Sequence, residues 1–171
     1  MTGPTSAYQP TSISARLSAA PRYSYRDDAA VPRFDDAHAL IVYDGVCVFC
    51  SHAMTAIARG DPRRHFQFAS AQSPLGHALF RHYGLDPETF ETVLLLADGR
   101  AFGKLEAVRE IARVVGGAWR LTKLMRLLPR WAQDRAYDLV AHNRYRIFGR
   151  TTSCQQPGAT WRARVIDYPA E

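Results

Sequence analysis

The stretch that decides the fold runs from Leu40 to Ser51 and reads Leu-Ile-Val-Tyr-Asp-Gly-Val-Cys-Val-Phe-Cys-Ser. Its first four residues are an apolar, β-rich run that stops at Asp44-Gly45, which is typical of a buried strand ending in a turn. Cys47 and Cys50 follow, three residues apart, where the pattern becomes helical. Residues at that spacing share one helix face, so their thiols can close a disulfide with modest adjustment. The stretch therefore predicts a redox-active dithiol at the start of a helix.

The composition is that of one soluble globular domain. The chain has 171 residues, of which 47% are hydrophobic and 22% charged, and both shares are ordinary for such domains. No apolar run approaches the roughly 18 residues of a membrane span, and the start of the chain lacks the basic and apolar regions of a secretory signal. We therefore expect a cytoplasmic protein. Three cysteines are too few for a disulfide framework, and in a reducing compartment a C-x-x-C pair is more often catalytic or metal-binding.

The net charge of +6 is concentrated in the last third of the chain. Residues 119–164 carry ten basic residues against Asp134 and Asp138 alone. Such an excess can attract anionic partners. We favour a solvated helical face, because no pattern of a nucleic-acid-binding module accompanies it; we expect no nucleic-acid partner, and the oligomeric state stays open.

Hydrophobic periodicity and turn residues divide the middle of the chain into alternating elements. Asp98-Gly99 is the strongest hairpin signal, and Ser73-Pro74 is a typical helix start. The predicted strands are residues 40–43, 66–69, 92–97 and 100–103, and the predicted helices are residues 48–59, 74–83, 105–115, 119–128 and 130–146.

The first seven elements follow the order β-α-β-α-β-β-α, which predicts two successive right-handed crossovers and a terminal hairpin. The result is an α/β fold of the thioredoxin type, with a four-stranded mixed sheet, helices on both faces and a C-terminal helical extension. We expect residues 1–37 to be a disordered tail, residues 38–150 to be the domain, and residues 151–171 to be irregular, with Trp161, Val165 and Ile166 able to attach them to the core.

Several motifs resemble the DCC family of predicted thiol–disulfide oxidoreductases. Residues 44–50 match its D-G-x-C-x-x-C signature, and residues 68–73 (Phe-Ala-Ser-Ala-Gln-Ser) are similar to its second strand and following turn. Glu106-Ala107 is similar to the start of its third helix, although Leu105 stands where serine is usual. Residues 128–130 and 143–149 resemble its C-terminal signature. The resemblance covers about residues 39–154 and implies a thioredoxin-like fold and disulfide exchange.

One feature departs from better-known thioredoxin-like enzymes. Those enzymes place a cis-proline just before the third strand, where it helps to bind the substrate backbone. Here that approach reads Phe90-Glu91-Thr92-Val93-Leu94, and Pro87 lies too early. Substrate docking is therefore expected to differ or to be weaker.

Cys47 is the candidate nucleophile, because it lies nearest the helix start and is expected to be the more exposed cysteine. Its thiolate would attack a substrate disulfide, and Cys50 would resolve the mixed disulfide. Asp44 is the third candidate: it would take a proton from Cys50, or cap the amides of the turn, or do both. The partner would be a disulfide-containing protein or a low-molecular-weight thiol. No bound cofactor is needed, because the two cysteines carry two electrons themselves.

Two other functions remain open at this point. The pair could be half of a zinc site, with further ligands drawn from Cys154, His38, His52, His77 or His82, although no second pair has finger-like spacing. A catalytically silent interaction domain with a thioredoxin-like fold is the other. Outside the motif, His52 is expected to face solvent and Cys154 to be inert. Residues 143–146 (Asn-Arg-Tyr-Arg) could bind an anionic substrate end, and we favour a structural role for them.

Overall fold

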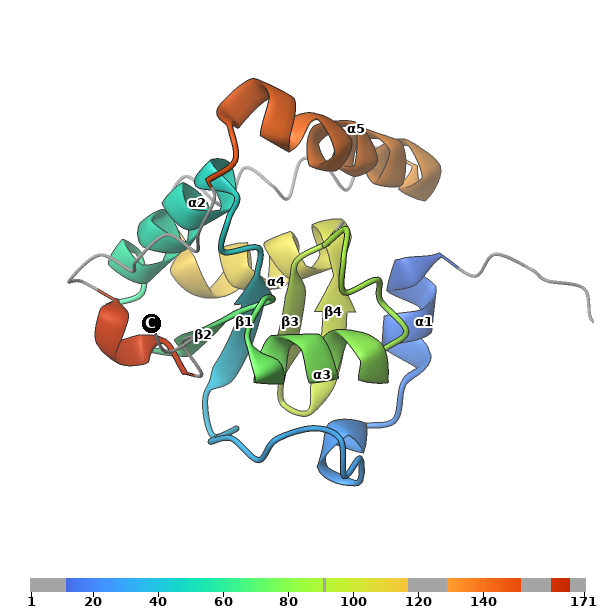
Figure 1. Cartoon of the computed structure of the whole chain (residues 1–171), viewed down its shortest axis with the longest axis vertical. Coiled ribbons are helices and arrows are strands. Elements are labelled where there is room, and N and C mark those ends of the chain that lie inside the picture. The colour runs from blue at the N-terminus through green and yellow to red at the C-terminus, as the bar shows by residue number, and fades with distance from the viewer. Residues whose placement is uncertain (1–11, 91, 117–128, 152–160, 167–171) are drawn as a thin grey trace, which may run out of the picture.

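A four-stranded mixed sheet forms the centre of the computed structural model, which describes residues 12–90, 92–116, 129–151 and 161–166. The strands are β1 (Ala39–Tyr43), β2 (Phe66–Ser70), β3 (Leu94–Ala97) and β4 (Arg100–Gly103), in the order β2-β1-β3-β4. The mixed α/β fold expected from the sequence is confirmed, and it is consistent with a thioredoxin-like arrangement (Figure 1).

The sheet contains both parallel and antiparallel pairs of strands. β1 pairs in parallel with β2, whereas β3 is antiparallel to both β1 and β4. The tight turn between β3 and β4 is Asp98-Gly99, where both residues have positive φ, as the sequence predicts. Only the first connection therefore joins parallel strands. A right-handed crossover joins parallel strands. The prediction of two successive right-handed crossovers is therefore wrong for the second connection, because β3 runs antiparallel to β1.

Helices cover both faces of the sheet. In Figure 1, α3 (Pro74–His82) lies in front of the sheet and α4 (Lys104–Val115) behind it. Alternate residues of β1 serve the two faces, because successive side chains of a strand point in opposite directions. Leu40 and Val42 pack with α3 and with α1 (Ile13–Ala19). Ile41 and Tyr43 pack with α4 and with α2 (Val48–Arg59).

The expected disordered tail is wrong for residues 12–37. Leu17 of α1, Tyr25 of the short 3-10 helix η1 (Ser24–Arg26) and Val31 are all buried in the core cluster that contains α3. Tyr25 also donates a hydrogen bond to Asp36, which Arg26 contacts through two nitrogens. These apolar residues follow no helical or strand period, which is why the pattern did not reveal them. Residues 1–11 lie outside the described part.

The last long helix, α5 (Arg130–Phe148), crosses the end of the sheet at which α2 begins (Figure 1). The predicted helix at residues 119–128 lies outside the described residues. Further along, Trp161 is buried against Tyr43 and Phe68, and the backbone N–H of Ile166 donates to Phe68 O at 2.8 Å. The prediction that these residues attach the C-terminal segment to the core is confirmed.

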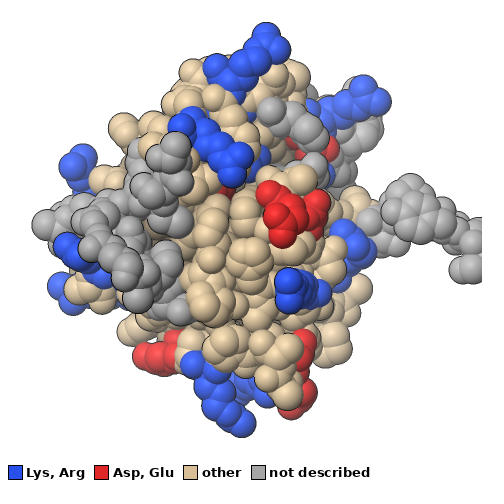
Figure 2. All heavy atoms as spheres, viewed as in Figure 1, with Lys and Arg blue, Asp and Glu red and all other residues tan. Residues whose placement is uncertain are grey.

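Among the residues that the structure describes, basic side chains form no single concentrated patch on the face drawn in Figure 2. Lys and Arg side chains are scattered there and mixed with Asp and Glu. None of the helices within the described ranges is long and apolar enough to span a membrane.

Candidate active site

Cys47 and Cys50 lie where β1 gives way to α2. Cys47 is the N-cap residue of α2, and its sulfur accepts a hydrogen bond from the backbone N–H of Cys50 at 3.3 Å. Both are free thiols, and the Cys50 thiol donates to the Cys47 sulfur over a Sγ–Sγ distance of 2.7 Å. The structure thus places both thiols at the start of a helix, within reach of each other, as the sequence predicts.

The hydrogen bond makes the two thiols unequal as acids. Donation from the Cys50 thiol is the main cause that lowers the pKa of Cys47, to about 7, with help from the Cys50 N–H and from the charge of Arg144. Burial and the nearby charge of Asp44 oppose this change. The pKa of Cys50 is raised, first because its proton is held by Cys47 and then because of burial. At neutral pH the arrangement favours a thiolate on Cys47 and a thiol on Cys50.

Cys47 is the less exposed of the two, contrary to the sequence expectation. Its exposed fraction is 0%, whereas Cys50 is half-buried. Residues 149–151, named here the C-terminal strap, cover it from the end of α5. Arg150 forms an antiparallel bridge with Cys47, and both the backbone N–H and the hydroxyl of Thr151 donate to Val46 O.

An aromatic pair closes the same side of the site. Phe148, the last residue of α5, stacks on Phe49 of the C-x-x-C motif with ring centroids 4.7 Å apart. Both rings are partly exposed to solvent. The end of α5 and the C-terminal strap therefore contact the motif both through the backbone and through side chains.

Asp44 is buried directly before the motif, where it has several partners. Its Oδ1 accepts from the backbone N–H of Val46 at 3.2 Å, which is the turn-capping role considered for it. The same oxygen accepts from the Gln72 amide at 2.7 Å. Gln72 in turn accepts from the N–H of Gly45 at 2.9 Å. Gln72 therefore binds two residues of the turn, Asp44 and Gly45.

The negative charge of Asp44 is balanced by α5. Arg144 Nη2 lies 3.1 Å from Asp44 Oδ2, and the Tyr145 hydroxyl donates to the same oxygen. Arg144 is buried and also donates to the carbonyls of Thr89, Phe90 and Ala141. Burial is the largest single influence and lowers the pKa of Arg144, but the hydrogen bond to Asp44 and the charges of Tyr145, Asp44 and Cys50 together exceed it, so the pKa is raised. Burial, followed by the bond to Asp44, raises the pKa of Tyr145 to about 12.

This arrangement resolves the role of residues 143–146. Arg144 and Tyr145 reach the site, while Asn143 donates to Leu139 O within its own helix and Arg146 is exposed. The structural interpretation holds in part, because Arg144 anchors α5 to the loop before β3. The anionic-substrate interpretation gains no support from Arg144, because its charge is paired with Asp44 and both Nη atoms donate to acceptors of the protein, although its buried Nε has no partner.

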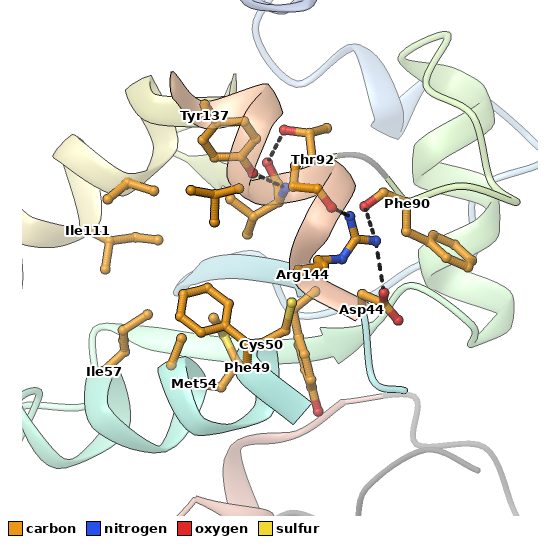
Figure 3. Close-up of a pocket in the computed structure, with 16 residues that line it drawn as sticks. Asp44, Phe49, Cys50, Met54, Ile57, Phe90, Thr92, Ile111, Tyr137 and Arg144 are labelled. Atoms are coloured by element: carbon orange, nitrogen blue, oxygen red, sulfur yellow. Dashed lines mark hydrogen bonds and ion pairs between the residues drawn. The ribbon is translucent and has the colours of Figure 1, made fainter. Parts of the chain in front are cut away.

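An apolar pocket of about 200 Å³ adjoins the cysteines (Figure 3). Cys50 borders it, and Cys47 does not. Its walls come from α2, α4, α5 and the residues just before β3; the lining residues that Figure 3 labels are Asp44, Phe49, Cys50, Met54, Ile57, Phe90, Thr92, Ile111, Tyr137 and Arg144.

The metal alternative gains no third ligand from the described residues. Among them, no group of three or more His, Cys, Asp and Glu side chains is placed to hold an ion. His52 is exposed on α2, as expected. Cys154 lies outside the described residues, and with it the expectation that this thiol is inert.

Comparison with known proteins fits this geometry. Residues 41–150 match the family model described as DCC1-like thiol-disulfide oxidoreductase. The chain belongs to this family. The uncharacterized protein YuxK of Bacillus subtilis (strain 168) is 32% identical over 127 residues, which cover 74% of this chain and 93% of YuxK. A chloroplastic DCC family protein of Arabidopsis thaliana is 30% identical over 122 residues, which cover 71% of each chain. No solved structure gives a significant match.

Sequence reasoning missed the partners of Asp44. Gln72 stands within the residues 68–73 that resemble the DCC family, and Arg144 and Tyr145 stand within residues 143–149, so the signal was the motif itself. No pattern within either motif indicates that its side chains converge on one carboxylate, because that depends on how α5 packs. Tyr137, whose hydroxyl accepts from the N–H of Val93 at 3.2 Å, had only the helical pattern as a signal, which predicts that it lies on the apolar side of residues 130–146 with Val140 and Ala141.

Proposed function

We propose that the chain is a thiol–disulfide oxidoreductase in which Cys47 is the nucleophile and Cys50 the resolving cysteine. The observation that carries the proposal is the 2.7 Å contact in which the Cys50 thiol donates to the Cys47 sulfur. It supplies a stabilised thiolate and a second thiol within reach of the bond that must be resolved. The family's description supports the same reaction class.

The exchange balances in two steps. The Cys47 thiolate attacks one sulfur of a substrate disulfide, whose S–S bond breaks, and the leaving thiolate takes up a proton. Cys50 then loses its proton and attacks the Cys47 sulfur of the mixed disulfide. The second substrate thiol leaves, the Cys47–Cys50 disulfide forms, and two electrons have passed to the substrate. A thiol or dithiol donor reverses these steps.

Asp44 is the proposed proton acceptor in the second step. Its charge acts on both thiols, raising the pKa of each. The charge of Asp44 keeps the proton on Cys50 while Cys47 is the thiolate. Once the mixed disulfide has formed on Cys47, the carboxylate accepts that proton as the general base of the second step. The bond from Arg144 keeps the charge of Asp44 from fully opposing the Cys47 thiolate. Reduction of disulfides is the proposed direction, and the cytoplasm is the proposed compartment, although the Arabidopsis relative is named as chloroplastic.

The test is a redox titration of metal-free protein, with thiols trapped by alkylation and located by peptide mass. We expect Cys47 and Cys50 to pair reversibly at a potential between about −270 and −120 mV, the range of known exchange enzymes. In Cys50→Ser protein, a disulfide probe should be trapped on Cys47, while Cys47→Ser protein should trap little. A mixed disulfide found only on Cys50 would reverse the two roles.

Two outcomes would replace the proposal. Protein that binds zinc stoichiometrically through both cysteines, and unfolds with chelator, would be a metal-binding module. If the cysteines never pair and Cys47→Ser changes nothing, the chain is a silent interaction domain.

A further inference from the structure

The apolar pocket beside Cys50 has the properties of a binding site for part of the substrate. We propose that it takes the uncharged, apolar arm of a low-molecular-weight disulfide or dithiol, whose sulfur atoms then lie at the cysteine pair. This inference rests on the proposed function, because it names the substrate class for the same two cysteines. Cys50 lines the pocket and Cys47 does not, but the Cys47 Sγ lies only 2.7 Å from the Cys50 Sγ.

The size of the pocket fits a small group. It holds about 200 Å³, and an apolar protein cavity of about 150 Å³ is large enough to bind benzene. A five- or six-carbon chain or a single ring therefore fills it. Each methylene transferred there from water contributes about 0.8 kcal/mol, or roughly fourfold in affinity.

The lining disfavours a charged arm. Of the 16 residues that line the pocket, only Asp44 and Arg144 are charged, and they are paired with each other at 3.1 Å. Most of the rest are apolar, including Ala53, Met54 and Ile57 of α2. An anionic or zwitterionic thiol such as glutathione would have to lose its hydration there, while the charge of Arg144, the only cation among the described lining residues, is already neutralised by Asp44. The Arg144 Nε–H has no partner and offers a hydrogen bond without a net positive charge at the site.

The backbone near the pocket disfavours an extended polypeptide. A peptide that adds to a fold as a strand needs free N–H and C=O groups. Here Phe90 O accepts from Arg144 Nη2 at 3.1 Å, and the N–H of Val93 donates to the Tyr137 hydroxyl at 3.2 Å. Side chains of α5 thus occupy the stretch where better-known thioredoxin-like enzymes hold the substrate backbone. The pocket can therefore hold the apolar arm of a small substrate but not an extended peptide backbone.

The chemistry is the exchange already described, run in either direction. In the reducing direction for the protein, a dithiol loses two protons and two electrons. One of its sulfurs attacks the Cys47–Cys50 disulfide, which breaks, and the first freed cysteine takes up a proton. The second sulfur then attacks the mixed disulfide, so that the dithiol closes into a cyclic disulfide and the second cysteine leaves and takes up the other proton. The arm stays in the pocket throughout, so its chemistry affects the rate while the sulfur chemistry remains the same.

The test compares two dithiols that differ only in the end of the arm. Oxidised protein is mixed with dihydrolipoamide, whose arm is neutral, or dihydrolipoate, whose arm ends in a carboxylate, and protein thiols are trapped over time. We expect dihydrolipoamide to reduce the protein at least about tenfold faster at pH 7, because the carboxylate loses water in the pocket. Dithiothreitol, which has no arm, gives the reference rate.

Matched variants locate the effect. Ala53→Phe fills the pocket from α2 and should bring the dihydrolipoamide-to-dihydrolipoate ratio close to one. Ala56→Phe makes the same change on the exposed side of the same helix and should keep the wild-type ratio. Should Ala53→Phe fail to fold, Val140→Gln serves on α5, where Val140 lines the pocket yet is 47% exposed. Its control is the neighbouring Leu139→Gln, at a residue that is 68% exposed and outside the lining.

Failure of this inference differs from failure of the proposed function. If the Cys47–Cys50 disulfide forms reversibly but the two dithiols react equally, or if Ala53→Phe keeps the wild-type ratio, the pocket does not select an apolar arm. If both dithiols react no faster than dithiothreitol while the reduced protein rapidly reduces insulin, the substrate is a polypeptide. If no such disulfide forms, both proposals are wrong.

Discussion

Arg144 and Asp44 form a buried ion pair of 3.1 Å, although they lie 100 residues apart in the sequence. The pair joins α5 to the turn that carries the C-x-x-C motif. It also sets the electrostatic balance at Cys47, because the charge of Arg144 lowers the pKa of that thiol and the charge of Asp44 raises it. One contact therefore serves both the packing of α5 and the acidity of the candidate nucleophile.

Replacing Arg144 by Gln should raise the pKa of Cys47, since the charge of Asp44 is then unopposed. Alkylation of Cys47 at pH 7 should slow by about threefold or more, and the free energy of unfolding should fall by about 3–5 kcal/mol because a buried carboxylate loses its partner. The measurement is the pH profile of alkylation. The double variant Arg144→Gln/Asp44→Asn should restore the profile; if it does not, Arg144 acts only through packing.

Asp44→Asn alone should have opposite effects on the two steps of exchange. Removing the negative charge lowers the pKa of Cys47, so the first attack at pH 6 should be faster. Resolution should be slower, because Cys50 loses its proposed proton acceptor. Rapid-quench trapping should therefore show a longer-lived mixed disulfide on Cys47. Unchanged resolution would limit Asp44 to its bonds with Val46, Gln72 and α5.

The pH dependence of the reduced protein follows from the signs of the two shifts. The pKa of Cys47 falls to about 7, so alkylation should reach half its maximum rate near pH 7. Between pH 7 and the unfolded value of about 9, the unfolded chain binds more protons, and stability should rise with pH by at most about 3 kcal/mol. Above pH 9 the raised pKa of Cys50 reverses this, because only the unfolded chain loses that proton. The measurement is the free energy of unfolding in urea as a function of pH, for wild-type protein and for the Cys47→Ala/Cys50→Ala variant, which lacks both thiols. A difference between the two proteins that does not change with pH would contradict the prediction.

The sequence predicted the elements of this fold better than their contacts. The helix bounds Val48–Arg59 and the strand Arg100–Gly103 agree with the sequence prediction, because Cys47, Gly60 and the Asp98-Gly99 turn mark their ends locally. The direction of β3 and the burial of Cys47 were not predicted. Both depend on segments that approach from far away in the sequence, β1 in one case and residues 149–151 in the other.

Weakening the contact between Phe148 and Phe49 should expose Cys47. Phe148→Ala removes the 4.7 Å stacking and loosens the end of α5 from which the C-terminal strap continues. Aromatic pairs contribute about 0.5–1.5 kcal/mol beyond their burial, so alkylation of Cys47 should accelerate by about two- to tenfold. Ile147→Ala is the control, because Ile147 is exposed and has no part in the stacking. Equal rates in the two variants would mean that the strap holds without the ring.

Residues 12–37 should contribute to stability, which a disordered tail would not do. Leu17 is 2% exposed, and it lies so close to Gly103 that a Cβ added there would meet Leu17 Cδ1 at 2.5 Å. Leu17→Ala should lower the free energy of unfolding by about 2–5 kcal/mol, the usual cost of a buried leucine. Gly103→Ala should also destabilise, because the new methyl group displaces Leu17. In a Leu17→Ala background, Gly103→Ala should lower the free energy of unfolding much less, since the new methyl group then occupies the space that Leu17 leaves. Ser14→Ala is the control, because Ser14 lies on the same helix but is partly exposed. Urea denaturation measures all four variants, and a Leu17→Ala protein as stable as wild type would return residues 12–37 to the tail that the sequence pattern predicted.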